Sequence, residues 1–208
     1  MIRSENLSFK YASSDVITFP TIRISRHQHT LLLGESGCGK TTLLHLLGGL
    51  SFPHSGKVFI EDQDIYLWNE EKRDLFRAQN IGFIFQDAHL LKNLTVAENI
   101  ILAQYLAKAK QDKQAVMAVL DKLQMQEKAD AYPHELSRGQ LQRAAIARAV
   151  INNPKILIAD EPTAALDDTN TKYVMDLLFD TAEKFDVTLL IATHDTRIKP
   201  YFQNTYQL

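Results

Sequence analysis

The sequence has little cysteine and no excess of charge of one sign. Only one of its 208 residues is a cysteine, Cys38. A single cysteine cannot form an intrachain disulfide, which excludes a disulfide-stapled fold and fits a reducing compartment. The 23 Lys and Arg residues are balanced by 25 Asp and Glu residues, giving a formal net charge of -2. This balance excludes a globally basic nucleic-acid-binding protein.

The sequence also lacks long apolar runs. The longest candidates, at 30–33 and 187–193, fall well below the roughly 18 residues of a membrane-spanning helix. The first 15 residues have no apolar segment of the kind that secretory signals carry. We therefore expect a soluble chain whose membrane role, if it has one, depends on a partner. The composition, 45% hydrophobic and 23% charged, predicts one globular domain over residues 1–208.

Short apolar runs alternate with helical patterns along the chain. Strands are predicted at 22–24, 30–33, 57–60, 80–86, 156–159 and 187–192, and helices at 39–50, in two segments between 95 and 128, and at 139–151. The last two strands are continuously apolar, which is typical of strands buried on both faces of a parallel sheet. This alternation predicts an α/β core with a largely helical insert near 88–150.

The strongest motif is GESGCGKT, from Gly34 to Thr41, between a predicted strand and a leucine-rich helix. It matches the phosphate-binding pattern GxxxxGK[ST]. Its glycines let successive backbone N–H groups point into one concavity, and the helix start that follows favours negative charge. We expect Lys40 to pair with β- and γ-phosphate oxygens and the Thr41 hydroxyl to bind Mg²⁺. A chance glycine-rich turn would match this pattern in roughly one chain in a hundred, and the strand and helix around it lower that rate.

Two consecutive acids, Asp160 and Glu161, end the apolar run that begins at Ile156. Considered alone, these acids would merely end a strand. The phosphate-binding loop upstream favours a second interpretation, because nucleotide-bound Mg²⁺ needs a carboxylate at the carboxyl end of a neighbouring parallel strand. We therefore expect Asp160 in the water shell of the metal. Glu161 is expected to polarise the water that attacks the γ-phosphate.

These motifs resemble those of the ATP-binding subunit of an ABC transporter, and the resemblance covers nearly the whole chain. LSRGQ, at 136–140, resembles the family's signature loop LSGGQ, and it opens a helix. In the family, this loop contacts the γ-phosphate held by the other subunit, so that ATP is sandwiched in a head-to-tail dimer. The expected contacts are Ser137, Gly139 and Gln140, while Arg138 replaces the first glycine of the pattern. Considered alone, Ser137 would be only a helix N-cap.

Four further residues take their roles from the resemblance. Gln86 resembles the glutamine that touches Mg²⁺ or the attacking water, and Asp167, in AALDD, resembles the aspartate that reaches across the dimer. His194, in IATHD, resembles the switch histidine that contacts the γ-phosphate and orients water. Tyr11 resembles the aromatic residue that stacks on adenine. Phe9 lies two residues away, and either ring could instead fill core space.

The resemblance implies a P-loop NTPase (RecA-like) core with an antiparallel β subdomain and a helical subdomain, with ATP as substrate and Mg²⁺ as cofactor. The expected nucleotide contacts are Tyr11, Gly34, Glu35, Ser36, Gly37, Cys38, Gly39, Lys40, Thr41, Thr42, Gln86, Ser137, Gly139, Gln140, Asp160 and Asp167. The expected metal contacts are Thr41, Gln86 and Asp160, and the expected catalytic residues are Lys40, Gln86, Glu161 and His194. Cys38 is expected to serve as a small side chain in the loop, where thiol reagents would block ATP binding.

Details such as TVAENI at 95–100 resemble the branch with the lipoprotein-releasing, macrolide-export and cell-division ATPases. This implies a homodimer, peripheral on the cytoplasmic side of the inner membrane, that works with a separate permease. The segment 87–95 would receive the permease, with Leu90, Leu91 and Leu94 either exposed there or packed within the insert. The alternative is a soluble ABC ATPase acting on ribosomes or DNA. The single motif set, without sustained heptads or a cysteine cluster, disfavours it, and we expect no nucleic-acid partner.

Overall fold

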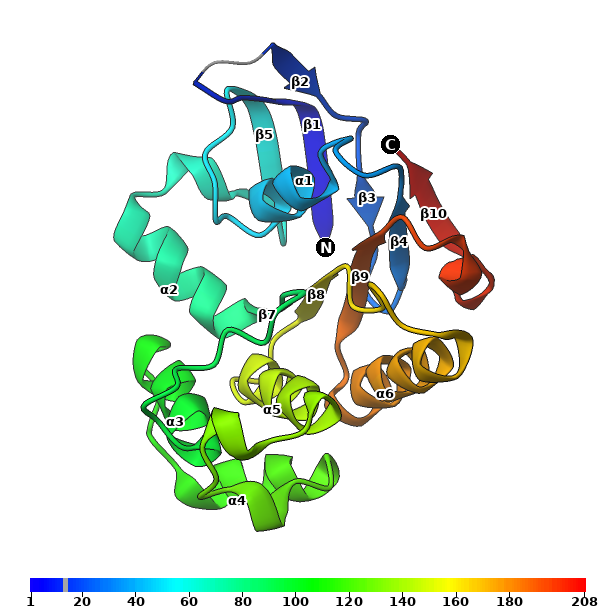
Figure 1. The fold of residues 1–208 in the computed structure, drawn as a ribbon. Coiled ribbons are helices and arrows are strands. Elements are labelled where there is room, and N and C mark those ends of the chain that lie inside the picture. Colours follow the sequence, from blue (N-terminus) through cyan, green and yellow to red (C-terminus); the bar gives the residue numbers. More distant parts are fainter. Residues whose placement is uncertain (13–14) are drawn as a thin grey trace.

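Two five-stranded sheets organise the fold (Figure 1). The structure, a computed structural model, describes residues 1–12 and 15–208. The first sheet is antiparallel and contains β2 (Val16–Thr18), β1 (Ile2–Lys10), β5 (Ser55–Ile60) and β6 (Gln63–Asp64) in that order, with β3 (Arg23–Ile24) paired to β1. The second sheet is parallel, in the order β10 (Asn204–Gln207), β4 (Thr30–Leu33), β9 (Thr188–Thr193), β8 (Ile156–Asp160) and β7 (Ile81–Ile84).

The parallel sheet lies at the centre of the protein, covered on both faces. Strands β4 and β9 are buried at every position. On one face, Leu32 and Leu190 pack in a core with α1 (Lys40–Leu47) and the antiparallel sheet. On the other face, Leu31 and Leu189 pack with α5 (Arg138–Val150) and α6 (Asp168–Phe185). Burial on both faces explains why these strands are continuously apolar rather than alternating.

Helices fill the long connection between β7 and β8 and the one before β7. The helix α2 (Glu70–Asn80) leads into β7, and α3 (Val96–Leu106) and α4 (Lys113–Lys122) precede α5. Capping side chains fix the starts of α3 and α4: Thr95 and Glu98 form a reciprocal capping box, and Asp112 accepts from two backbone N–H groups. Of these, α3, α4 and α5 form the end of the molecule remote from the antiparallel sheet, and α2 lies between that end and the sheet (Figure 1). Three of them, α3 to α5, lie within the range 88–150 for which an insert is predicted.

Short 3₁₀ segments complete the connections. They are η1 (Ile65–Leu67), η2 (Gln126–Lys128), η3 (Pro133–Glu135) and η4 (Thr196–Tyr201). Over the residues that the structure describes, no helix is both long enough and apolar enough to cross a bilayer.

One boundary differs from the predicted one in a way that matters for the site. The strand predicted at 80–86 ends at Ile84, which places Gln86 in the loop beyond it. The helix predicted from Gly39 ends at Leu47, just before the Gly48-Gly49 pair at which the sequence pattern stops, and Gly49 takes a left-handed φ of 70°. The phosphate-binding loop therefore opens a short helix of eight residues.

Candidate functional site

The predicted catalytic groups meet because three neighbouring strands are parallel. Strands β4, β9 and β8 pair side by side, so their carboxyl ends lie at the same edge of the sheet. Backbone hydrogen bonds fasten the loops that leave these ends: the N–H of Gly34 donates to the Thr193 carbonyl at 3.3 Å, and the N–H of Glu161 donates to the Ala192 carbonyl at 2.8 Å. Ligands of α/β proteins commonly bind at this edge.

The glycine-rich loop from Gly34 to Lys40 is shaped by conformations that favour glycine. Gly37 and Gly39 have φ angles of 84° and 98°, and Gly39 is the N-cap of α1. A Cβ atom on Gly34 would lie 2.7 Å from the Cys38 Sγ atom, so the loop is tightly wound there. This tight winding ahead of a helix start is what a phosphate-binding loop requires.

Lys40 is folded back into this loop. Its Nζ atom donates to the carbonyl oxygens of Gly34 and Glu35, at 2.9 Å each, and lies 3.4 Å from the Glu161 Oε1 atom. Its side chain is only 5% exposed. A buried ammonium needs such partners because its desolvation is costly. The same atom is available to phosphate oxygens that would replace these contacts.

Glu161 is held on two sides. Its Oε2 atom accepts from the Thr193 hydroxyl at 2.8 Å and lies 3.0 Å from Nδ1 of His194. Burial acts to raise the pKa of this carboxyl, but hydrogen bonds from His194 and Thr193, with the charges of His194 and Lys40, lower its pKa overall. Glu161 also has a left-handed φ of 48°, a strained conformation that is concentrated at functional sites. It is therefore an ionised, oriented carboxylate that can accept a proton from water.

Asp160 has a buried oxygen without a hydrogen-bond donor. Among the described residues, nothing donates to its Oδ1 atom. Burial raises the pKa of this carboxyl, and a hydrogen bond with the Thr41 side chain partly opposes that rise. An unsatisfied carboxylate oxygen beside a hydroxyl is suited to a hard cation or to its bound water. Thr41 and Asp160 therefore fit a Mg²⁺ ion, the cofactor that the phosphate loop implies.

Tyr11 lies beside the start of α1. Its hydroxyl is 2.6 Å from the Thr42 Oγ1 atom, and the residue is 50% exposed. Phe9 contacts it edge to face, with ring centroids 4.8 Å apart, and packs against the core between the two sheets. Of the two aromatic candidates, Tyr11 is the one with open surface next to the loop.

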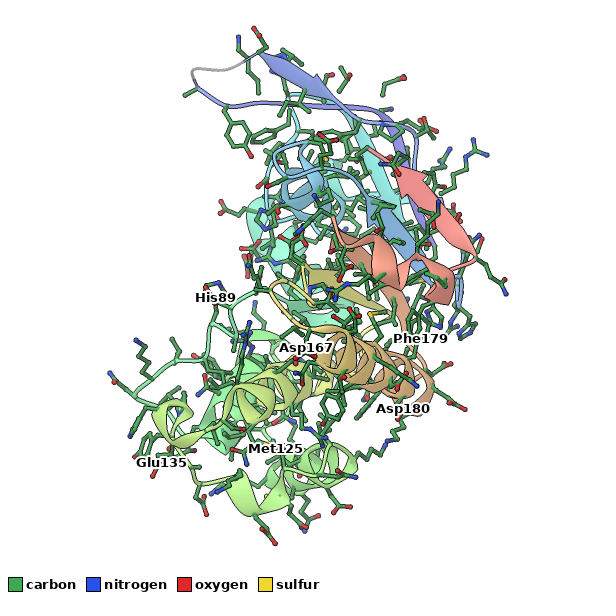
Figure 2. All side chains as sticks on the ribbon, turned by 45° about the vertical axis from the view of Figure 1, so that its right-hand side comes forward. His89, Met125, Glu135, Asp167, Phe179 and Asp180 are labelled. Carbon is green, nitrogen blue, oxygen red and sulfur yellow. The ribbon has the colours of Figure 1, made fainter. Side chains whose placement is uncertain are left out.

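Part of the predicted signature loop and Asp167, the predicted crossing residue, line a second space. A cavity of about 540 Å³ is lined by residues that include Gln86, Gly139, Glu161 and Asp167. Asp167 starts α6 (Figure 2), where it accepts hydrogen bonds from the backbone and side chain of Asn170, at 2.8 Å each. These bonds lower the pKa of Asp167, and the residue is exposed.

Ser137 and Gln140 form a capping box at the start of α5. The Ser137 side chain accepts from the backbone N–H of Gln140 at 3.3 Å, and the Gln140 side chain accepts from the backbone N–H of Ser137 at 2.9 Å. Within the described part of the chain, neither side chain hydrogen-bonds to the phosphate loop. One copy of the chain therefore brings together Lys40, Thr41, Asp160, Glu161 and His194, whereas of the three signature contacts only Gly139 shares a cavity with Glu161.

Sequence reasoning did not single out three residues that shape this site. Thr193 orients Glu161, and Arg197 joins the loop after β9 to the turn before α6. Arg148, on α5, donates to the carbonyl oxygens of His89 and Ala88 at 2.6 and 2.9 Å, just beyond Gln86. Its burial lowers its pKa. The only local signal was a polar residue ending an apolar strand at Thr193, because the other contacts depend on tertiary neighbours.

Comparison with known proteins shows the family to which a chain with this site belongs. A family model described as "ABC transporter" matches residues 20–164, which is more than half of the chain. The chain belongs to the ABC transporter family. It is 39% identical over 179 residues to the lipoprotein-releasing system ATP-binding protein LolD of Buchnera aphidicola subsp. Schizaphis graminum, covering 85% of this chain and 78% of that protein. The Bacteroides fragilis LolD is 34% identical over 210 residues, covering 100% and 97%.

A solved ABC cassette has the same fold. The ATP-binding cassette MJ0796, in a dimeric post-hydrolysis state bound to ADP and Pi, superimposes with a TM-score of 0.87 at 29% identity, covering 100% of this chain and 94% of that one. The predicted P-loop NTPase fold of the ABC ATPase type is confirmed. As a member of this family, the chain is an ATP-binding subunit that hydrolyses ATP with Mg²⁺ as cofactor.

Proposed function

We propose that this chain is the ATPase of a transporter in the branch of lipoprotein-releasing, macrolide-export and cell-division systems. Two copies close head to tail around two Mg-ATP and drive a separate permease. The observation that carries the proposal is the contact of Lys40 and His194 with Glu161 at the carboxyl edge of the sheet. The similarity to LolD proteins supports the branch, and the dimeric form of MJ0796 supports the pairing.

The residues of one copy divide the chemistry. When ATP binds, oxygens of its β- and γ-phosphates accept the hydrogen bonds of Lys40, while Glu161 keeps its contacts with Thr193 and His194. Glu161 then accepts the proton of the attacking water, and His194 orients that water against the γ-phosphate. The water oxygen bonds to the γ-phosphorus while the bond to the β-phosphate oxygen breaks, so that ADP and phosphate are the products. Bound Mg²⁺ would supply positive charge against the phosphates. Thr41 and Asp160 would hold it together with Gln86, which lines a cavity with Glu161.

The partner copy completes the site. We place Ser137, Gly139 and Gln140 against the γ-phosphate held by the other copy, and Asp167 at the contact between the two copies. A Cβ atom added to Gly139 would meet nothing within 4 Å, so the backbone there is open to an approaching ligand. Arg138 is exposed at the first position of α5, where its charge adds to that of the helix start.

We propose the segment 87–95 as the surface that binds the permease. Leu91 is 52% exposed, Leu90 packs against the core and Leu94 is half-buried, so the two predicted alternatives divide among these residues. The buried Asn99 side chain donates to the carbonyl oxygens of Leu91 and Leu94 at 3.1 Å. We place the permease's cytoplasmic helix here, the helical subdomain over 88–150, and the chain on the cytoplasmic side of the inner membrane.

Gel filtration of Glu161→Gln with and without Mg-ATP tests the dimer. The variant should bind ATP, lose turnover and shift to a dimer only when ATP is present. Lys40→Ala is the matched control, which should stay monomeric because it lacks the phosphate contact. Wild-type turnover by Glu161→Gln would contradict the assignment of the base, and an ATP-bound chain that stays monomeric would contradict closure without the permease.

Capture from solubilised membranes tests the docking segment. Leu91→Asp should release a membrane-protein partner that co-purifies with the wild-type chain. Val16→Asp, an equally exposed apolar position on the antiparallel sheet at 45%, should not. Co-purification with RNA or DNA instead of a membrane protein would contradict the transporter assignment.

A further inference from the structure

A continuous set of hydrogen bonds connects the turn before α6 to Glu161 within one chain. Arg197, in η4, is at the centre of this set and belongs to none of the motifs described above. Its Nε and Nη2 atoms donate to the two carboxylate oxygens of Asp195, both at 2.8 Å. This bidentate geometry is the strong form of an arginine–carboxylate pair. Asp195 is well covered, with a side chain only 9% exposed.

The remaining donors of Arg197 reach the turn before α6. Its Nη1 atom donates to the Asp168 Oδ1 atom at 2.5 Å, and Nη2 also donates to the Leu166 carbonyl at 3.1 Å. These two acceptors flank Asp167, the residue that we place at the contact between two copies. Arg197 therefore holds both sides of that residue at once.

The other side of Asp195 leads to the catalytic base. Its backbone N–H donates to the Thr193 hydroxyl oxygen at 3.0 Å, and that hydroxyl donates to the Glu161 Oε2 atom at 2.8 Å. The buried Thr163 hydroxyl also donates to Asp195, at 3.1 Å, so Asp195 has little freedom to move alone. A displacement of the turn before α6 is therefore passed to Glu161 through groups in direct contact.

We propose that Arg197 is a positioning residue that couples the turn at 164–168 to the orientation of Glu161, so that contact with the second copy aligns the base for hydrolysis. The inference rests on the proposed function, because it takes Glu161 as the base and Asp167 as the residue at the copy-to-copy contact. Arg197 touches neither ATP nor the attacking water in this scheme. Its removal should affect turnover rather than nucleotide binding.

Steady-state ATPase and ATP-binding titrations of Arg197→Ala test the coupling. We expect kcat to fall roughly tenfold, a usual size for coupling between sites, while ATP affinity stays within about twofold. The kcat of Arg197→Lys should be intermediate, since a lysine keeps the positive charge but cannot donate two parallel hydrogen bonds to Asp195. The matched control is Arg26→Ala, which removes an exposed ion pair with Asp186, 3.4 Å long and distant from the site, and should leave both values unchanged.

A double-mutant cycle separates coupling from loss of folding. Asp168 is 89% exposed, so Asp168→Ala should fold normally and still lower kcat. Combined with Arg197→Ala, it should add nothing further, because the contact of Asp168 with Arg197 is already lost in that variant. The proposal is overturned if either single variant turns over ATP at the wild-type rate, or if their effects on kcat simply add.

Glu161→Gln, measured in the same series, distinguishes failure of the proposed function from failure of the role of Arg197. Wild-type turnover by this variant would overturn the proposed function and the coupling together. If Glu161→Gln loses turnover and dimerises with ATP while Arg197→Ala hydrolyses normally, only the role of Arg197 is wrong.

Discussion

Lys40 and Glu161 face each other with their Nζ and Oε1 atoms 3.4 Å apart, and their side chains are only 5% and 16% exposed. The two opposite charges lie side by side, which offsets part of the cost of burying both. The phosphates of ATP compete with Glu161 for Lys40. The proposed base is thus held ionised by contacts that are already in place, and in the proposed mechanism ATP replaces Glu161 as the partner of Lys40.

Lys40→Ala should weaken ATP binding roughly hundredfold, because a charge-assisted contact worth about 2–3 kcal/mol is lost. An ATP titration by calorimetry measures this. The control is Lys108→Ala, since Lys108 forms an exposed ion pair with Glu71, and its loss should not alter affinity. ATP affinity in Lys40→Ala within threefold of wild type would contradict the assignment.

Asp160→Asn should stabilise the nucleotide-free protein while abolishing Mg²⁺-dependent turnover. The pKa of Asp160 is raised, so folding disfavours its charged form, and this destabilisation is present at neutral pH. The variant should gain about 1 kcal/mol or more, or roughly 2–4 °C in melting temperature per kcal/mol. The gain should shrink as pH falls through the folded pKa, because wild-type Asp160 then becomes neutral too. Thermal melts of both proteins at several pH values measure this. A melting temperature of Asp160→Asn at pH 7 that is equal to or below that of the wild type would contradict the prediction.

Tyr11→Ala should weaken ATP binding roughly two- to tenfold, the range expected when one aromatic stack is lost. Tyr11→Phe keeps the ring and loses only the hydrogen bond with Thr42, so its affinity should stay near wild type. Phe9→Leu, which alters a ring packed against the core, should lower stability and leave ATP affinity unchanged. Binding titrations in which Phe9→Leu has the larger effect would assign the adenine contact to Phe9 instead.

N-ethylmaleimide should abolish ATP binding by alkylating Cys38. The thiol is half-buried, and the tight approach of Gly34 leaves no room for an added group without distorting the loop. Bound ATP should protect the thiol, and Cys38→Ala should bind ATP and resist the reagent. Because the sequence has no other cysteine, equal sensitivity of Cys38→Ala would show that the reagent acts elsewhere.

The parallel strands and the phosphate loop could be predicted because each apolar run leads directly into its motif. Other elements gave weaker signals. β1 pairs with β5 across an irregularity between Glu5 and Ser8, where Asn6 takes a left-handed φ of 48°, and this breaks the alternation that would mark a strand. β10 has no fully buried residue, and its backbone simply continues the sheet beside β4.

Two helices were missed for opposite reasons. In α2 only Arg73 is fully buried and Phe76 packs partly buried against the core, so the helix has few apolar positions that could mark a face. In α6, Val174, Met175 and Leu178 do form such a face, and the pattern was readable from the sequence. In the site, the motif residues were identified one by one, but their mutual contacts were not. The links made by Thr193 and Arg197 arise only when the ends of β8 and β9 meet.

Helix α5 has Ser137 at its start and Arg148 near its end, where the guanidinium donates hydrogen bonds to the carbonyl oxygens of Ala88 and His89. Its 13 helical residues make a rigid rod about 20 Å long. The signature loop and the anchor of the segment after Gln86 therefore lie at opposite ends of one continuous helix.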